Sequence, residues 1–563
     1  MKTNIKLLLF AAVLTSLVAA CEDKPTMPEI PTPGGGGPDV DKPQNVSQTW
    51  LNYLYQNDEN ILVDYSFAGY KYGEVEPPAV ETLGYTTYNI TDAKYGAIPN
   101  DNLSDQAAFE MAMKDAIADP VGGIVYCPEG KFELRAQNDK SSMMFNGGNI
   151  VIKGASRDKT ILKMSYANAL TNPAQLWTAP PLIHIKHNSG TSHHRNVTED
   201  APIGSYSVTV ENTAGLSVGM WVALELKDND PEVVKYALGE GDLELGNSRM
   251  QNLIPAADII QNGVDVDEYH VIKKIVGNVV TFHEPIHHKI NKTWNWKLAK
   301  YNNYENVAVE DICFQGEAPA DFQHHKLFDT SYGTGFSYDC AFTPLSFNRL
   351  TNSWMRRVNF VSVSDCLSIS GCSNVSVYDI RISGNRGHSA VKSNGSTKVF
   401  IGKVKDMASG STGQWHGVGV AKPAIGTVIW RSNWGSSACY ESHASQPRVS
   451  LIDMCTGAFK TGHQGGAEGS LPNHMEGMVM WNFNASSGLG DVKLAWWDFS
   501  SKYWKLLPVA LIGYHGANTT FSPDDTKVDE SHGQKVYPES LYEAQLERRL
   551  GYVPSWLLEI KAL

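Results

Sequence analysis

The sequence predicts an all-β solenoid, a parallel β-helix, and three observations lead to this fold class. Short apolar runs return along the chain and are separated by turns rich in glycine and asparagine. Long amphipathic helical patterns are few. Histidines recur at His388, His416, His443 and His474, at intervals of 28, 27 and 31 residues. A fixed period of about 20–50 residues is typical of solenoids. We therefore expect these histidines to stack in a column, one coil above the next, about 5 Å apart.

Length and composition suit one elongated repeat fold or several ordinary domains. The chain has 563 residues, of which 42% are hydrophobic and 19% charged, so most of it should fold. Its formal net charge is -13, without a basic stripe, which argues against nucleic acid as a partner. An anionic substrate stays open, because a local basic cleft can lie on an acidic protein.

The N-terminus is typical of an export signal. Lys2 and Lys6 flank the start of an apolar run that ends in Leu-Val-Ala-Ala before Cys21. This pattern resembles the lipobox of bacterial lipoproteins, which implies cleavage before Cys21 and lipidation of that residue. The acidic pair that follows resembles surface-export signals of Bacteroidetes lipoproteins. We therefore expect an outer-membrane lipid anchor, at the cell surface or in the periplasm. The apolar run is too short to span a membrane as a helix.

The pattern along the chain predicts five segments. In order, they are a signal peptide with lipobox (1–21), a Pro/Gly linker (22–45), an N-terminal packed segment (46–87), a β-helix catalytic domain (88–535) and a C-terminal capping helix (536–563). Within the β-helix we expect a side insertion at about 227–268, between strands at 205–226 and 270–286. Insertions on one face of a solenoid often border the binding groove.

Residues 88–134 carry the beginning of the fold. They contain a Gly-Ala turn at Gly96, a helix capped by Ser104 or Asp105 with Met111 on its apolar face, a Gly-Gly turn into a strand, and Pro-Glu-Gly. This order resembles the opening of the pectate-lyase superfamily of right-handed parallel β-helices. The resemblance covers roughly residues 85 to 560. It implies a capping helix over the open N-terminal end and a polysaccharide ligand.

A second resemblance concerns the run from Glu441 to Phe483 and the C-terminal Ser-Leu-Tyr-Glu-Ala-Gln-Leu. These residues resemble Bacteroidetes secreted β-helix proteins that are grouped with polysaccharide lyases, and in particular polysaccharide lyase family 29, lyases of chondroitin-type glycosaminoglycans. The resemblance implies an anionic polysaccharide as substrate. It does not allow the family's catalytic residues to be placed on this chain, so the site residues below are inferred from chemistry.

The residues of the histidine repeat favour β-elimination over hydrolysis. Elimination from a uronic acid needs a group that neutralises the carboxylate, a base for the C5 proton and an acid for the leaving oxygen. Histidine, lysine, arginine and tyrosine suit these roles near neutral pH. Hydrolysis needs a pair of carboxylic acids, and carboxylates are scarcer in this region.

We therefore predict a polysaccharide lyase for uronic-acid-containing polymers. The predicted catalytic residues are His416, His443, His388, Tyr440 and Glu441. The predicted substrate-binding residues are Arg448, Lys392, Asn473, His474, Arg357 and Trp415. In this scheme His416 or His443 is the base, and the carboxylate is neutralised by His388, Arg448 or Asn473. Tyr440 is the acid, while Glu441 orients a histidine, binds a metal or acts as a base.

Two other functions stay open. A glycoside hydrolase would use Glu441 with a second carboxylate. A non-catalytic glycan-binding surface lipoprotein would be favoured if the histidines prove buried. A lone histidine on a β-helix is more often a packed residue than a base, so we expect one or two of the four to be structural.

No cofactor is evident from the sequence. Seven cysteines remain besides Cys21, and their odd number and spacing argue against a zinc site and favour buried free thiols. A calcium site would need several convergent oxygen ligands, and no such cluster is visible. We assign no metal-binding residue, calcium stays possible without a supporting cluster, and we expect a monomer as the oligomeric state.

Overall fold

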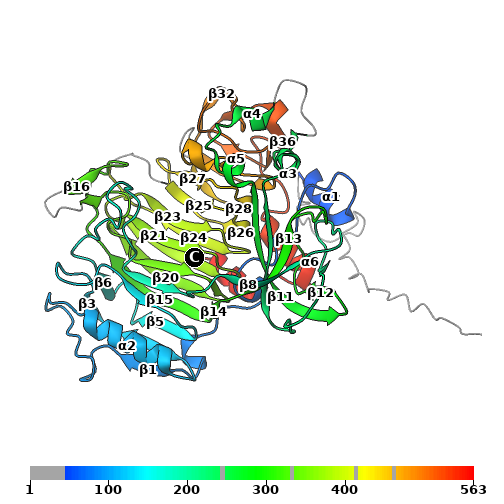
Figure 1. Cartoon of the computed structure of the whole chain (residues 1–563). Helices are drawn as coiled ribbons and strands as arrows, with labels where there is room; N and C mark the ends of the chain where they lie inside the picture. Colours follow the sequence, from blue (N-terminus) through cyan, green and yellow to red (C-terminus); the bar gives the residue numbers. More distant parts are fainter. Residues whose placement is uncertain (1–44, 241–247, 330–334, 411–415, 460–464) are drawn as a thin grey trace, which may run out of the picture. The chain divides into compact units, whose positions relative to one another are not determined.

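The computed structural model describes residues 45–240, 248–329, 335–410, 416–459 and 465–563. In these ranges the chain alternates between two large parallel sheets, adding one strand to each sheet in almost every coil (Figure 1). This arrangement is a parallel β-helix, which confirms the predicted fold class. The predicted signal peptide, with Cys21, lies outside the described residues.

The larger sheet has fourteen strands. In spatial order, twelve of them are β1 (Thr86–Asn89), β2 (Gly123–Cys127), β5 (Ile150–Gly154), β15 (Val307–Gln315), β20 (Trp354–Val361), β22 (Ser376–Ser383), β24 (Phe400–Asp406), β26 (Ile425–Trp430), β28 (Arg448–Asp453), β30 (Met478–Trp481), β33 (Val509–Ile512) and β36 (Thr526–Glu530). The other two, β3 (Gly130–Glu133) and β6 (Thr160–Lys163), pair with each other and through β6 with β15.

The second sheet has ten strands. They are β4 (Met143–Phe145), β7 (Ile183–Lys186), β18 (Leu345–Asn348), β21 (Asp365–Ser370), β23 (Ser389–Asn394), β25 (His416–Ala421), β27 (Cys439–Ser442), β29 (Thr456–Ala458), β31 (Asn484–Ser487) and β34 (His515–Gly516). Each strand pairs in parallel with its neighbours, so residues one coil apart lie side by side.

The main core lies between the two sheets. Apolar side chains from both sheets fill it, among them Ile369 and Val391 of the smaller sheet and Ile380 and Ile401 of the larger one, all fully buried. Side chains alternate between the two faces of a strand, so the intervening positions of the smaller sheet point outward. In the central coils, these outward positions carry the polar residues described below.

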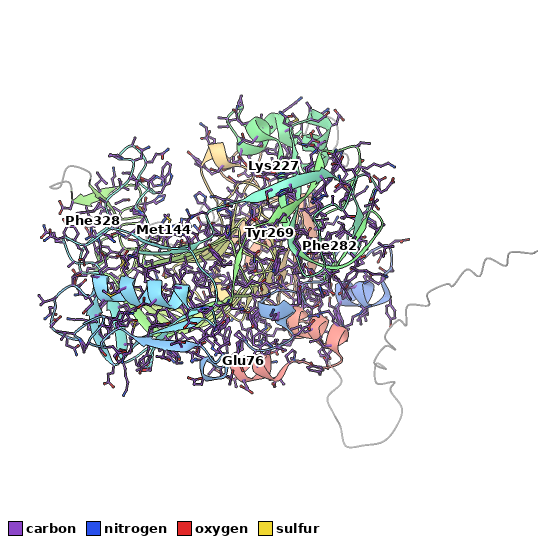
Figure 2. All side chains as sticks on the ribbon, turned by 60° about the horizontal axis from the view of Figure 1, so that its bottom comes forward. Glu76, Met144, Lys227, Tyr269, Phe282 and Phe328 are labelled. Atoms are coloured by element: carbon purple, nitrogen blue, oxygen red, sulfur yellow. The ribbon has the colours of Figure 1, made fainter. Side chains whose placement is uncertain are left out.

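A second sheet system interrupts the solenoid between β7 and β15. Its six antiparallel strands are β8 (Thr191–Asn196), β9 (Ser207–Thr209), β10 (Trp221–Asp228), β11 (Val264–Val276), β12 (Val279–Phe282) and β13 (Trp296–Tyr301). Helices α3 (Pro231–Ala237), α4 (Arg249–Asn252) and α5 (Asp258–Asn262) connect β10 to β11. Lys227, Tyr269 and Phe282 of this insertion are labelled in Figure 2.

The insertion is larger than the sequence predicts. Strands expected at 205–226 and 270–286 belong to the antiparallel sheet, and β10 pairs there with both β11 and β13. The insertion also has its own apolar core, which includes Leu224, Val266 and Leu298. An alternating apolar run looks the same whether its strand pairs in parallel or antiparallel, so the sequence pattern did not separate the insertion from the coils.

Three two-stranded sheets and four short 3₁₀ helices complete the regular elements that the structure describes. The sheets are formed by β14 (Tyr304–Glu305) with β19 (Leu350–Thr351), β16 (Leu327–Asp329) with β17 (Phe336–Ser337), and β32 (Gly490–Leu494) with β35 (Thr519–Phe521). The 3₁₀ helices are η1 (Tyr70–Gly73), η2 (Val80–Thr82), η4 (Glu468–Ser470) and η5 (Pro523–Asp525).

Helix α2 (Gln106–Ala118) packs beside β1 and β2, at the end of the larger sheet. Asp105 is its N-cap residue, as predicted, and the Asp105 carboxylate accepts hydrogen bonds from the backbone N–H groups of Ile98 and Glu133. Phe109 and Met113 are buried on the apolar face, whereas Met111 is exposed. The prediction for Met111 was wrong because the buried face is rotated toward these two larger side chains.

The N-terminal segment 45–85, here called the N-terminal strap, crosses the outer face of the larger sheet. It begins at the last coils, where the backbone N–H of Ser47 donates to Tyr537, and helix α1 (Gln48–Tyr55) follows. Further on, the N–H of Gly69 donates to Lys398 in the middle coils. The strap ends at the first coils, where Val80 packs in one cluster with Ile124 and Val151.

Helices α6 (Leu541–Leu550) and α7 (Ser555–Lys561) lie on the same outer face. Leu541 and Leu557 share a buried cluster with Val428 and Leu451 of the sheet. The Asp453 carboxylate of β28 accepts hydrogen bonds from Ser540 and from the first backbone N–H groups of α6. The C-terminal helices therefore cover the side of the solenoid, whereas the sequence predicted a cap on its open end.

Seven cysteines are free and buried in the described residues, as the sequence predicts. They are Cys127, Cys313, Cys340, Cys366, Cys372, Cys439 and Cys455. Among the helices that the structure describes, none is long and apolar enough to cross a membrane.

Candidate functional site

The outer face of the smaller sheet carries an ion pair between alternate strands. The register aligns Lys392 of β23 with Gly419 of β25, and Gly419 with Glu441 of β27. Because Gly419 has no side chain, Lys392 reaches over its strand, and Nζ lies 2.8 Å from Oε2 of Glu441. The Glu441 side chain is fully buried, and that of Lys392 is 17% exposed.

Two histidines join this ion pair at the beginnings of β23 and β25. His388 directly precedes β23, and His416 is the first residue of β25. The backbone N–H of His416 donates to the carbonyl of His388, and the two ring centroids are 5.1 Å apart. Nδ1 of His416 lies 3.3 Å from Oε1 of Glu441, and Nδ1 of His388 lies 3.7 Å from Oδ1 of Asp365 on β21. A carboxylate therefore faces the Nδ1 atom of each ring.

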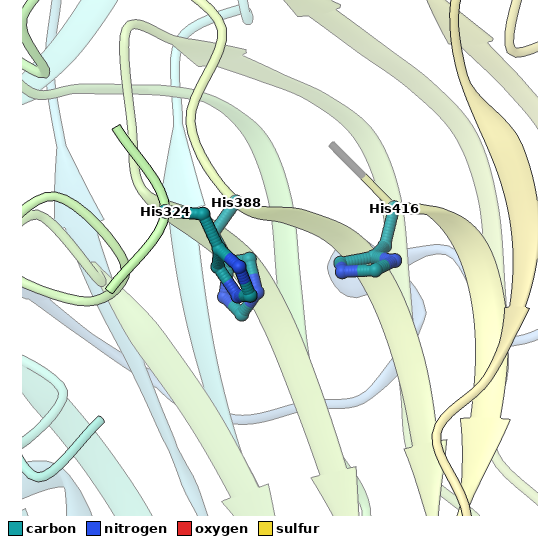
Figure 3. A group of neighbouring side chains, drawn as sticks. All are labelled: His324, His388 and His416. Carbon is teal, nitrogen blue, oxygen red and sulfur yellow. The ribbon is translucent and has the colours of Figure 1, made fainter. Parts of the chain in front are cut away.

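A third histidine reaches the site from the long excursion between β15 and β18. The ring of His324 lies 5.2 Å from that of His388 and 6.4 Å from that of His416, measured between centroids. Figure 3 shows all three rings, with His324 on a loop and the other two at adjacent strands. The turn at His324 is held by Asp339, whose buried carboxylate accepts from the backbone N–H of His325.

His443 follows β27 and completes the cluster. Its backbone N–H donates to Val420, and its half-buried ring lies 6.4 Å from that of His416 at an interplanar angle of 89°. The backbone at Gly466 passes close to the ring, since a Cβ placed there would lie 2.8 Å from both Cε1 and Nδ1 of His443. A larger residue at 466 would push the ring away.

Burial and neighbouring charges set the protonation of the site. Burial raises the pKa of Glu441, but His416 and Lys392 lower it further, to about 2, so this carboxyl is ionised at neutral pH. Burial, with neighbouring imidazoles, lowers the pKa of His324 to about 4 and that of His388 well below its ordinary value. These two imidazoles are therefore neutral at pH 7.

In contrast to Glu441, two further carboxyl groups have raised pKa values. Burial raises the pKa of Asp365 to about 7, with Lys392 opposing the shift. Burial also raises the pKa of Asp339 to about 7, and the backbone N–H of His325 opposes it. Each group can therefore carry a proton near neutral pH, as a general acid must.

The structure brings together five of the predicted site residues, namely His388, His416, His443, Glu441 and Lys392. It places Tyr440 elsewhere, since this side chain points into the core between the sheets and is 1% exposed. Alternation along β27 explains the difference: when Glu441 points outward, its neighbour must point inward. Trp415 and Cys21 lie outside the residues that the structure describes.

The remaining predicted residues have contacts with other parts of the chain. Arg448 is fully buried against the insertion, where it donates to the backbone carbonyl of Asp265. His474 is buried, with Nε2 2.9 Å from Ser450 Oγ. Asn473 is buried and accepts from the backbone N–H of Lys505 through Oδ1.

Arg357 belongs to β20 of the larger sheet, where it pairs with Glu310 and Asp311. The fourth member of the histidine period, His474, is therefore a packed residue. This agrees with the expectation that one or two of the four are structural.

Sequence reasoning missed His324, Asp339 and Asp365. The adjacent pair His324-His325, in an excursion that leaves the coil rhythm, is a signal that could have pointed to the first of these. Asp365 lies one coil before His388, on the strand whose register aligns it with Ser389. Asp339 has no sequence signal, because it lies in the same excursion, between β17 and β18, outside the coil rhythm.

Comparison with protein families finds one match. Residues 413–560 match a family described as a domain of unknown function, DUF4955. The matched part contains His416, Glu441 and His443, whereas His324, His388 and Lys392 precede it. A search of curated proteins finds no match.

Comparison with solved structures finds similar chains at low sequence identity. A tailspike protein of Pseudomonas phage LKA1 is 11% identical over 77% of this chain and 77% of its own, with a TM-score of 0.37. The A-module of a mannuronan C-5 epimerase from Azotobacter vinelandii is 12% identical over 80% of this chain and 96% of its own, with a TM-score of 0.38. An exopolygalacturonase from Thermotoga maritima is 10% identical over 79% of this chain and 83% of its own, with a TM-score of 0.31.

Proposed function

We propose that the protein is a polysaccharide lyase that cleaves an anionic, uronic-acid-containing polysaccharide by β-elimination. One observation carries the proposal: His324, His388, His416 and His443 meet around the Lys392–Glu441 ion pair on the outer face of the smaller sheet. A parallel β-helix offers a long face to a polymeric ligand, and this cluster supplies basic groups on that face.

His443 suits the role of base. Its ring lies beside Gly466 and is half-buried, and no carboxylate of the described residues forms an ion pair with either of its nitrogens. A neutral imidazole accepts a proton readily near neutral pH. In the proposed reaction His443 takes the proton from C5 of the uronate.

The other histidines suit the role of recognising the uronate carboxylate. Removing a proton next to a carboxylate leaves negative charge on the carboxylate oxygens, so donors directed at those oxygens stabilise the transition state. His388 and His416 lie 5.1 Å apart between ring centroids, close enough to contact one carboxylate together. The carboxyl groups of Asp365 and Glu441 lie 3.7 Å and 3.3 Å from the Nδ1 atoms of these two rings.

The elimination is balanced without a co-reactant. The C5–H electron pair forms the C4–C5 double bond, the C4–O bond breaks, and the leaving oxygen takes a proton. The imidazolium of His443 can return its proton to that oxygen when the proton and the leaving group are on the same face of the sugar. Tyr440, predicted for this step from the sequence, points into the core.

The test is direct. The protein is incubated with a panel of uronate polysaccharides, such as chondroitin-type, pectic and alginate polymers, and the ultraviolet absorbance of unsaturated products is followed alongside the release of reducing ends. The proposal expects both signals to rise together with one substrate class. New reducing ends without absorbance would exclude elimination, and binding without cleavage across the panel would indicate a glycan-binding protein.

A glycoside hydrolase is the second candidate, favoured by the pairing of protonated and ionised carboxyl groups. Asp365 and Asp339, with pKa values of about 7, could donate a proton, while Glu441, with a pKa of about 2, is ionised. This is the division of roles that a hydrolase needs. The assay above separates the two candidates, because hydrolysis gives reducing ends alone.

We further propose that the protein acts at the cell envelope, held by lipid on Cys21. The support is the lipobox-like sequence before this cysteine. The proposal expects the protein to fractionate with membranes and to incorporate labelled palmitate in its native host, and Cys21→Ser to abolish both. A Cys21→Ser protein that stays with the membrane fraction would contradict it.

A further inference from the structure

Three histidines from different coils converge on one point at the site. One ring nitrogen from each of His324, His388 and His416 lies within 4.8 Å of the other two. The rings come from a loop and from the starts of two adjacent strands (Figure 3). A tetrahedral zinc ion bonds to imidazole nitrogens at about 2.0–2.1 Å, which places them about 3.3 Å from one another.

The surroundings of two of these rings match those of metal ligands. A metal-binding histidine usually has its second nitrogen directed at a carboxylate, which fixes the ring and strengthens it as a ligand. Glu441 faces Nδ1 of His416 at 3.3 Å, and Asp365 faces Nδ1 of His388 at 3.7 Å. In rings held in this way, Nε2 is the nitrogen that faces the metal.

A buried ring nitrogen of His388 without a hydrogen-bond partner also indicates a ligand between these rings. Nε2 of His388 is buried, and the residues that the structure describes give it no hydrogen-bond partner. A buried polar atom without a partner costs free energy, and a metal ion bound there would remove that cost.

We propose that His324, His388 and His416 form a binding site for a divalent transition-metal ion, with zinc the best match. Three imidazoles with no thiolate suit zinc and its neighbours in the first row and do not suit calcium or magnesium, which prefer oxygen ligands. Three protein ligands also leave a tetrahedral ion one open position, as in catalytic zinc sites.

His388 and His416 are also the residues proposed to contact the uronate carboxylate, so a bound ion would take the place of that direct contact. If the ion takes part in catalysis, it would face the uronate carboxylate and polarise it as a Lewis acid, and this role rests on the proposed lyase function. The cluster differs from a thiolate zinc site, which the cysteine spacing excludes. The sequence pattern does not indicate this metal site, because His324 enters from an excursion outside the histidine period.

A second group of metal-ligating side chains shares His324 with the proposed site. His324 also lies with His325 and Asp339 in a group whose ligand atoms are within 4.8 Å of one another. The exposed ring of His325 stacks on that of His324 at 3.8 Å between centroids. Removing His325 therefore separates the two arrangements, because it belongs to the second group and not to the proposed site.

The experiment measures metal binding without any substrate. Untagged protein is stripped with a chelator, and zinc binding is followed by isothermal titration calorimetry. Cobalt(II) is used as a second probe, because its visible absorption reports the ligand number and geometry. Four variants are compared with the wild type, namely His324→Ala, His388→Ala, His416→Ala and His325→Ala, and circular dichroism and thermal unfolding of each metal-free protein check the fold.

The proposal expects one zinc ion per chain and an intense tetrahedral cobalt spectrum for the wild type. Loss of His324, His388 or His416 should weaken binding at least 100-fold, whereas His325→Ala should bind as the wild type does. Where an alanine variant unfolds, the glutamine variant of the same residue replaces it. A His325→Ala loss equal to that of His324→Ala would favour the second arrangement and overturn the proposal.

Glu441→Gln tests the supporting carboxylate, and it should weaken zinc binding about 10–100-fold. Absence of saturable binding, or histidine variants that bind like the wild type, would overturn the metal site. Because these measurements use no polysaccharide, the lyase assay can fail while the metal site stands. Equally, the metal site can fail while uronate cleavage is observed.

Discussion

Lys392 and Glu441 are two coils apart, yet their side chains form an ion pair of 2.8 Å across the strand between them. Gly419 makes this possible, because a Cβ at that position would lie 2.2 Å from the carbonyl oxygen of Glu441. The glycine is therefore required twice, once to let the lysine cross and once to let β25 and β27 approach.

Gly419→Ala should displace Glu441 and separate it from Lys392. Forcing a methyl group into this contact should cost about 1–3 kcal/mol of the free energy of unfolding, and turnover should fall at least tenfold. Chemical denaturation and initial rates measure the two effects. Gly190→Ala is the matched control, since a Cβ there meets its nearest atom at 3.7 Å. A Gly419→Ala protein with wild-type stability and rate would contradict the role of the glycine.

Glu441→Gln should leave the ammonium of Lys392 without its counterion. Breaking one partner of a buried ion pair costs about 3–5 kcal/mol, so the free energy of unfolding should fall by this order. The double variant Lys392→Met/Glu441→Gln removes both charges and should recover much of the loss in a double-mutant cycle. If the two single effects simply add, the pair is not coupled.

His443→Ala should abolish turnover while leaving the fold intact. A positioned general base contributes about 10²–10⁴-fold to the rate, and the ring is half-buried at a strand end, so the melting temperature should change little. His193→Ala, on the exposed surface of β8, is the control and should keep the wild-type rate. Wild-type turnover in His443→Ala would remove this residue from the reaction.

Asp365 should make stability fall with rising pH. Its pKa is about 7 in the folded protein, above the ordinary value of 3.8, because burial disfavours the charged form. Since the folded-state pKa is raised, the stabilising effect is complete below about pH 4 and is lost as pH rises to about 7. The difference in unfolding free energy between wild type and Asp365→Asn should therefore decrease across this window. A difference that stays constant from pH 4 to 7 would contradict the raised pKa.

Asp453→Ala should detach helix α6 from the larger sheet. The carboxylate accepts from Ser540 Oγ and from the backbone N–H groups of Leu541 and Tyr542. Each buried donor left without a partner costs about 1–3 kcal/mol, so the variant should lose about 3 kcal/mol or more. Asp453→Asn keeps one acceptor oxygen and should lose less. Equal losses in both variants would show that the hydrogen bonds do not determine the docking.

The solenoid and part of its site follow from the sequence because periodicity reports local geometry. Strands that repeat at coil spacing place His388, His416 and His443 in successive coils, and this part of the prediction agrees with the structure. The prediction is wrong for the fourth histidine, His474, because a longer interval places it in a different part of the coil. Spacing along the chain fixes which coil a residue occupies, but not which side of the coil it faces.

The other incorrect site predictions concern contacts between segments that are far apart in the sequence. His324 reaches the site across an excursion, and no local pattern encodes that approach. Tyr440 and Glu441 are neighbours in sequence, and only the register of β27 decides which of them points outward. Arg448 is basic, which suits a substrate-binding residue, but the insertion covers it and its guanidinium donates to the backbone carbonyl of Asp265.

The contacts of the N-terminal strap determine when it can dock during folding. Ser47 is synthesised long before its partner Tyr537. While the coils are being added, the strap has no complete surface to cross, and the apolar outer face of the larger sheet stays uncovered. Docking of the strap and of α6 must therefore be a late step, completed only after the last coils and α6 have been synthesised.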